Sequence, residues 1–105
     1  MLLLTGLTAA LLILDENRQE LRKLALTDAL TGIYNRHGFD KHVTVYMKKY
    51  PEKHCVGVQF DIDDFKLIND IYGHASGDKA LQILAESMRK FFPDHAVLGR
   101  NGGDE

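Results

Sequence analysis

The sequence predicts an α+β fold, an antiparallel-containing sheet with helices packed on it, preceded by an apolar helical leader. Two stretches, residues 36–50 and 77–92, repeat apolar side chains at three- and four-residue steps, which is typical of amphipathic helices. Residues 55–62 alternate apolar and other side chains, as a strand with one buried face does. Residues 1–14 carry no charge. With 105 residues, the chain has room for one small domain.

Charge and cysteine content exclude some classes of protein. The net charge of -2 and the pI near 6.2 come without a basic stripe that could neutralise a phosphate backbone, so no nucleic acid polymer is expected as a partner. Any nucleotide chemistry must therefore be local. The single cysteine, Cys55, excludes a disulfide framework and fits a reducing compartment. Its apolar neighbours predict a buried structural role.

The apolar segment 1–14 is mostly Leu, Ile and Ala. It is shorter than the roughly 20 residues that span a bilayer, and it lacks the basic start and small-residue cleavage site of a secretory signal. Three interpretations stay open: the end of a transmembrane helix, the start of an amphipathic or coiled-coil helix, or ordinary core. If the segment does span, Arg18, Arg22 and Lys23 favour a cytoplasmic position for the rest, anchored to the bacterial inner membrane.

Residues 15–27 predict a linker or signalling helix. Helix formers with charges of both signs dominate, and Leu14, Leu21 and Leu24 fall on one stripe. Such a stripe could pair with a second copy of the chain. Fewer than three heptads are present, so a solvated connector helix stays equally open.

Residues 28–105 then read as one partial domain. Thr31 and Gly32 mark a turn before the helix over 36–50, which Pro51 ends. The remaining predicted elements are a strand at 55–62, a short helix at 64–72 closed by Gly73, a helix at 77–92 stopped by Pro93, a strand at 96–100 and a hairpin turn at 101–103. The helix over 36–50 presents an apolar stripe of Phe39, Val43, Tyr46, Met47 and Tyr50.

Carboxylates gather where the first predicted strand ends. Asp61 and Asp63 are two residues apart and so share the side of the strand opposite its apolar face, and Lys66 and Asn69 follow in the next turn. Like charges this close favour a bound cation, and hard oxygen ligands suit magnesium. A solvated acidic loop is the alternative.

The chain ends with a glycine pair before two acids. Gly102 and Gly103 permit a tight hairpin turn, with Asp104 and Glu105 at its tip. If that hairpin lies beside the first strand, Asp104 could meet Asp61 across one metal ion. A plain surface hairpin is the alternative.

Four motifs in order resemble those of the GGDEF family, the diguanylate cyclase catalytic domain. Residues 28–36 read DALTGIYNR, residues 61–66 read DIDDFK, residues 69–78 read NDIYGHASGD, and residues 102–105 read GGDE. The resemblance covers about the first half of the usual domain and stops inside the signature motif. It implies the palm-like sheet of nucleotidyl cyclases and polymerases.

The resemblance also implies an activity in signal transduction. Family members condense two GTP molecules into cyclic di-GMP and release pyrophosphate, with Mg²⁺ or Mn²⁺ as cofactor and one GTP on each subunit of a homodimer. Asp61, the main-chain carbonyl of Ile62, and Asp104 match the metal ligands. Asp104 also matches the proton acceptor for the attacking 3′-hydroxyl, and Glu105 is the neighbouring candidate.

Substrate contacts carry over to matching positions in the same way. Asn69 and Asp78 match the residues that bind guanine, and Phe65 and Lys66 match the turn that meets the phosphates. His74 lines up with a histidine of the site, although packing between the helices is an equal alternative.

Two departures limit what the resemblance implies. The family's inhibitory RxxD motif is not matched here, where its positions fall on Pro93 and Ala96, so the resemblance does not extend to product inhibition through that site. The rest of the sheet would follow Glu105, so the 105-residue chain alone is expected to be inactive. The competing interpretation is a catalytically idle GGDEF module that binds GTP or a protein partner, although retention of the motif residues favours the enzyme.

Overall fold

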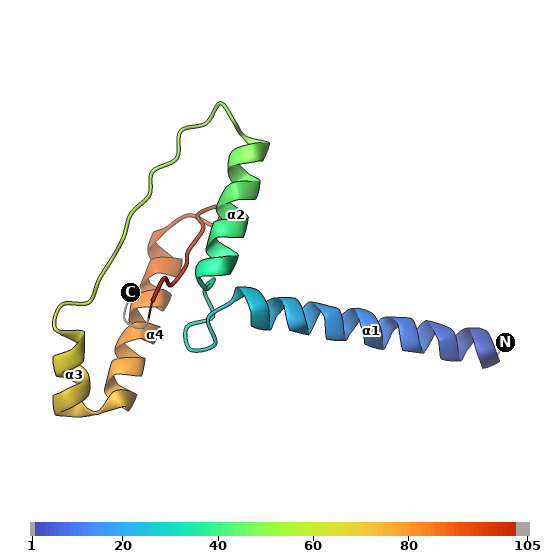
Figure 1. Cartoon of the computed structure of the whole chain (residues 1–105), viewed down its shortest axis with the longest axis horizontal. Helices are drawn as coiled ribbons and strands as arrows, with labels where there is room; N and C mark the ends of the chain where they lie inside the picture. Colours follow the sequence, from blue (N-terminus) through green and yellow to red (C-terminus); the bar gives the residue numbers. More distant parts are fainter. Residues whose placement is uncertain (1, 103–105) are drawn as a thin grey trace.

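The structure is a computed structural model that describes residues 2–102, with side chains described from residue 5 onward. It contains four helices: α1 (Leu2–Leu26), α2 (Arg36–Lys49), α3 (Phe65–Tyr72) and α4 (His74–Phe91). Helix α1 extends away from the other three, and α3 lies beside the start of α4 (Figure 1). The molecule is accordingly elongated, with extents of 62 × 43 × 21 Å.

The predicted sheet is absent from residues 2–102, so the expected α+β fold is wrong for this structure. Two isolated bridges are present, between Thr27 and Tyr34 and between Tyr34 and Gly99. Residues 96–100 do not form a strand with 55–62; instead, Tyr34 N donates to Leu98 O at 3.1 Å, and Arg100 N donates to Tyr34 O at 2.8 Å. Alternation shows which side chains share a face, but a strand also needs a partner with free backbone groups.

Residues 55–62 form an extended connection that runs from the end of α2 to α3 (Figure 1). They make no backbone hydrogen bond to any other residue that the structure describes. Cys55 is exposed, so its expected burial is also wrong. The cause is the same, because no strand within residues 2–102 covers this segment.

The described part of residues 1–14 does not form the separate apolar leader that the sequence predicts. Helix α1 continues without a break from Leu2 through the charged residues to Leu26. Residues 5–14 are all exposed, which contradicts the core interpretation. Within the described part of the chain, no helix is both long and apolar enough to cross a membrane.

The other predicted helices are confirmed with small changes in their bounds. Helix α2 ends one residue early, at Lys49, and α3 begins one residue late, at Phe65. Helix α4 begins at His74 rather than residue 77, because Gly73 alone separates it from α3.

Asn35 joins α1 to α2. Its side-chain oxygen accepts from Gly38 N at 2.8 Å, which caps α2, and its amide nitrogen donates to Ala25 O at 2.9 Å. Its backbone N also donates to Leu26 O at 2.9 Å. A Cβ on Gly38 would stand 2.0 Å from Leu26 O, so glycine is required where the two helices meet.

The hydrophobic core is small. Among the described residues, Ile33, Leu81 and Ala85 are the buried apolar side chains. The apolar faces of α2 and α4 instead line a hollow of about 720 Å³. Its walls include Phe39, Val43, Met47, Leu81, Leu84 and Met88. Except for Tyr50, the apolar stripe predicted for α2 therefore faces this hollow rather than a closed core.

We predict that Gly38→Ala destabilises the chain by about 1–3 kcal/mol, because the new methyl group meets a backbone oxygen that cannot move aside cheaply. The control is Gly6→Ala on α1, where no atom lies within 4 Å of the added Cβ. That change should be neutral or stabilising by up to about 1 kcal/mol. Urea unfolding followed by circular dichroism measures both. Equal effects of the two substitutions would contradict the close approach of α1 and α2.

Candidate functional site

The corner between α3 and α4 gathers the residues predicted to bind the base. Asp64 caps α3 with a left-handed backbone, at φ 56° and ψ 33°. Gly73, at φ 89°, ends α3, and its N–H donates to Asn69 O at 2.9 Å. Because one residue separates the two helices, α3 folds directly back onto the first turns of α4.

The side-chain oxygen of Asn69 is buried in this corner and has no hydrogen-bond partner among the described residues. It packs against Gly77 of α4, where a Cβ would stand 1.8 Å from that oxygen and 3.2 Å from Cζ of Phe65. Phe65, Asn69 and Gly77 therefore lie together. A buried acceptor without a donor costs free energy, and a ligand N–H could satisfy it.

Three other predicted substrate contacts surround this corner. Asp78 follows Gly77 on α4, His74 is the first residue of α4, and Lys66 lies in the first turn of α3. All three are exposed, and the structure shows no hydrogen bond or ion pair of their side chains with described residues. The exposure of His74 does not support its alternative role in helix packing. Their charged or polar groups are open to a solute.

The predicted metal ligands are only partly described. Asp61 is exposed and Ile62 half-buried, at the end of the extended connection, whereas Asp104 and Glu105 lie outside the described residues. Within residues 2–102, no three His, Cys, Asp or Glu side chains are grouped closely enough to hold a metal ion. Magnesium needs only one or two carboxylates besides water and phosphate oxygens, so the Asp61 carboxylate and the Ile62 carbonyl are donors of a fitting kind.

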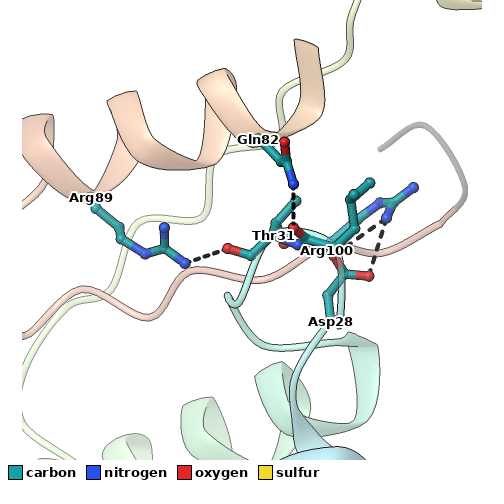
Figure 2. Close-up of polar contacts among 6 residues, drawn as sticks. Asp28, Thr31, Gln82, Arg89 and Arg100 are labelled. Carbon is teal, nitrogen blue, oxygen red and sulfur yellow. Dashed lines mark hydrogen bonds and ion pairs between the residues drawn. The ribbon is translucent and has the colours of Figure 1, made fainter. Parts of the chain in front are cut away.

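Sequence reasoning assigned no role to Asp28, yet its carboxylate is the most connected in the described structure. Its oxygens accept from Thr31 N at 2.9 Å and from Thr31 Oγ1 at 2.7 Å. They also accept from Arg100 Nη1 at 3.1 Å (Figure 2). The three-residue spacing to Thr31 is a local turn pattern, but no local pattern could reveal a partner 72 residues away.

Helix α4 holds the same turn from its other side. The Arg89 guanidinium donates to Thr31 O, and Gln82 Nε2 donates to Leu30 O at 3.2 Å (Figure 2). Thr31 is only 8% exposed. The turn over 27–34 is thus attached to α4 and to Arg100, which stands two residues before the glycines of the GGDE motif.

Two opposing effects set the pKa of Asp28. Burial raises it, but the hydrogen bonds from Thr31 and the nearby Arg100 guanidinium outweigh burial and hold the pKa below its ordinary value of 3.8. The folded state therefore favours the ionised carboxylate.

We predict that Asp28 contributes stability that is fully present above pH 3.8 and is lost as the pH falls toward its lower, folded-state pKa. Asp28→Asn lacks this titration. The difference in unfolding free energy between the parent chain and the variant, measured in urea at a series of pH values, should be constant near neutral pH and shrink below about pH 4. A difference that grows on acidification would contradict the assignment.

Comparisons with known proteins identify the family. The family profile described as "Diguanylate cyclase, GGDEF domain" matches residues 25–105. A diguanylate cyclase of Vibrio cholerae serotype O1 is 36% identical over 104 residues, which are 97% of this chain and 32% of that protein. The cyclic di-GMP phosphodiesterase NbdA of Pseudomonas aeruginosa is 37% identical over 94 residues, which are 88% of this chain and 12% of NbdA.

A solved structure shares the arrangement of the chain. The coiled coil and GGDEF domain of DgcB from Caulobacter crescentus, in complex with c-di-GMP, superposes with a TM-score of 0.79 at 28% identity. The match covers 95% of this chain and 53% of the DgcB chain. The present chain thus spans about a third of its Vibrio relative and about half of the DgcB structure. It belongs to the diguanylate cyclase GGDEF domain family.

Proposed function

We propose that the protein containing this chain is a diguanylate cyclase, which condenses two GTP molecules into cyclic di-GMP and releases two pyrophosphates. The observation that carries the proposal is the buried Asn69 oxygen that lacks a donor at the α3–α4 corner. The Vibrio relative bears the name of this activity. Because the chain spans only part of that relative, the activity is assigned to the longer protein rather than to these 105 residues alone.

Guanine fits the groups at the corner. The Asn69 oxygen and the Asp78 carboxylate can accept hydrogen bonds from the guanine ring N–H and exocyclic amine. The Asn69 amide nitrogen can donate to an acceptor on the base. Adenine presents a different donor and acceptor pattern, so the pair would select GTP. The close packing of Asn69 on Gly77 would hold the amide in one position before the base arrives.

The triphosphate would lie toward the start of α3. Lys66 supplies a cation there, and the backbone N–H groups that begin α3, including that of Phe65, can donate to phosphate oxygens. The Asp61 carboxylate and the Ile62 carbonyl would hold Mg²⁺ or Mn²⁺, which when bound stabilises negative charge on the reacting phosphate. Proton acceptance by Asp104, with Glu105 beside it, stays a prediction.

Two GTP molecules must face each other for both phosphodiester bonds to form, so we propose a homodimer. The matched DgcB structure includes a coiled coil, and α1 comprises 25 of 105 residues. A match over 95% of this chain must therefore include most of α1. The stripe of Leu14, Leu21 and Leu24 is exposed and suits helix pairing.

The location of the domain follows from its substrate. GTP is a cytoplasmic metabolite, so we propose that the domain faces the cytoplasm. Attachment to the inner membrane through residues 1–14 stays a prediction.

The second candidate is a GGDEF module that binds GTP or a partner without catalysis. The match to NbdA favours it, because that relative is named for hydrolysis of cyclic di-GMP rather than for its synthesis. The two candidates differ in whether residues 25–105 can support turnover when the rest of a domain is supplied.

A chimera provides the test. Residues 25–105 replace the matching segment of the Vibrio relative, and cyclic di-GMP formed from GTP and Mg²⁺ is measured by mass spectrometry. We predict activity in the chimera and at least a hundredfold loss in its Asp61→Ala form, because a metal ligand is removed from an exposed position. Lys41→Ala, at an exposed position on α2, is the matched control and should retain activity.

Three outcomes would each contradict one part of this proposal. A folded chimera that binds GTP without turnover, while the Vibrio parent is active, would favour the idle module. Full activity in the Asp61→Ala form would remove Asp61 from the site. Robust synthesis by the 105-residue chain alone would contradict its expected inactivity.

Base selection can be tested in the same chimera. We predict that Asn69→Ala reduces the preference for GTP over ATP at least tenfold, because the acceptor in the corner is lost. Gly77→Ala should have a similar effect without removing any polar group, because its methyl group would displace the Asn69 amide. Gly57→Ala, where no atom lies within 4 Å, is the control. Unchanged preference in both corner variants would exclude Asn69 from reading the base.

A further inference from the structure

The turn over residues 27–34 continues the end of α1. Thr27 N donates to Lys23 O at 3.0 Å, which extends the hydrogen-bond pattern of the helix by one residue. Asn35, directly after the turn, donates from its side-chain amide to Ala25 O at 2.9 Å. Both ends of the turn are therefore attached to the last residues of α1, so the turn and the helix move together.

Helix α4 holds the same turn through two side chains on one of its faces. The Arg89 guanidinium donates to Thr31 O, and Gln82 Nε2 donates to Leu30 O at 3.2 Å (Figure 2). Arg89 and Gln82 are seven residues apart, which is about two turns of helix. The guanidinium also lies against Gly32, where a Cβ would stand 2.9 Å from Arg89 Nη2. The glycine thus leaves room for this contact.

Helix α4 carries the proposed base-binding groups at its other end. Gly77, against which Asn69 packs, and Asp78 lie in its first two turns, whereas Arg89 lies in its last turn. Because the helix is unbroken over His74–Phe91, its two ends keep a fixed relation. Helices α1 and α4 do not pack against each other in the described chain, and α1 extends away (Figure 1). The contact between α4 and the turn therefore helps to set the direction of α1 relative to the corner.

We propose that Arg89 is a positioning residue for cyclic di-GMP synthesis, because it fixes the direction in which α1 leaves the α3–α4 corner. The inference rests on the proposed function, in which α1 pairs in a homodimer and two GTP molecules face each other. Once α1 is paired, a change in its angle to α4 turns the two corners away from each other. A second contact, from Arg89 Nη1 to Glu86 Oε2 at 3.3 Å, helps to hold the guanidinium in place.

This role predicts an effect on turnover rather than on binding. Asn69 and Asp78 lie at the opposite end of α4 from Arg89, so each subunit should bind GTP as before when Arg89 is replaced. Bond formation between two bound molecules depends on their separation and orientation, and a small misplacement lowers its rate strongly. A loss of kcat with an unchanged KM therefore separates positioning from recognition of the base.

Kinetics test the proposal in a chimera that carries this chain, α1 included, in place of the matching segment of the Vibrio relative. We expect Arg89→Gln to lower kcat at least about fivefold and to leave the KM for GTP within about twofold. Arg89→Lys keeps a donor for the Thr31 carbonyl and should restore most of the lost kcat. Lys90→Gln removes the same charge from the neighbouring exposed position, and this matched control should keep the kcat of the parent.

A second variant covers the case in which Arg89→Gln does not fold, as judged by circular dichroism. Gln82→Ala removes the other contact of α4 with the turn at an exposed position, and it should lower kcat in the same direction. An unchanged kcat in folded Arg89→Gln, or a rise in KM alone, would overturn the proposal. An inactive parent chimera would instead contradict the proposed function, and the role of Arg89 is then decided by a distance measurement.

That measurement needs no catalysis. Spin labels are attached at two exposed positions, Asn17→Cys on α1 and Ser87→Cys on α4, in a Cys55→Ser background. An excess of unlabelled chain ensures that double electron–electron resonance reports distances within one chain. We expect a narrow distance distribution in the parent and in Lys90→Gln, and a broader or shifted one in Arg89→Gln. Identical distributions in the parent and in Arg89→Gln would overturn the proposal.

Discussion

The Asp28 carboxylate holds together parts of the chain that are far apart in the sequence. It orders its own turn through Thr31 and binds Arg100, 72 residues away. The side chains of this ion pair are only 19% and 15% exposed, so solvent screens the attraction less than at an open surface. The carboxylate thus ties the end of α1 to the chain that leads into the GGDE motif.

The Asp28–Arg100 ion pair matters because the small apolar core contributes little to the stability of the fold. Three apolar side chains are buried in the described structure, and the faces of α2 and α4 border a hollow instead of each other. Polar contacts at the turn over 27–34 therefore carry much of the tertiary order. Arg89 and Gln82 extend these contacts to α4, so the helix that forms one side of the α3–α4 corner is fixed to the same turn (Figure 2).

Helices could be predicted from the sequence because their hydrogen bonds are internal. Repeats of three and four residues, together with Pro51 and Pro93, located α2 and α4 to within a few residues. The strands could not be predicted in this way, because alternation over 55–62 reveals a face but no partner. Tyr34 takes up the backbone groups of Leu98 and Arg100, and nothing in the sequence near Tyr34 indicates that pairing.

The candidate site was predictable where a motif is continuous in sequence. Asn69 and Asp78 could be named from one ten-residue stretch, but the buried Asn69 oxygen and its contact with Gly77 depend on how α3 folds onto α4. Arg100 and Asp28 stand at opposite ends of the domain sequence. Only the folded turn shows that they form a pair.

A double-mutant cycle measures how strongly Asp28 and Arg100 stabilise each other. Unfolding free energies are measured at neutral pH for the parent chain, Asp28→Asn, Arg100→Gln and the double variant. We predict a coupling energy of at least about 1 kcal/mol, because each single change removes one charge of an ion pair whose side chains are 15% and 19% exposed. Effects that add to within about 0.3 kcal/mol would show that the two residues act independently, and would contradict the central role of the Asp28 carboxylate.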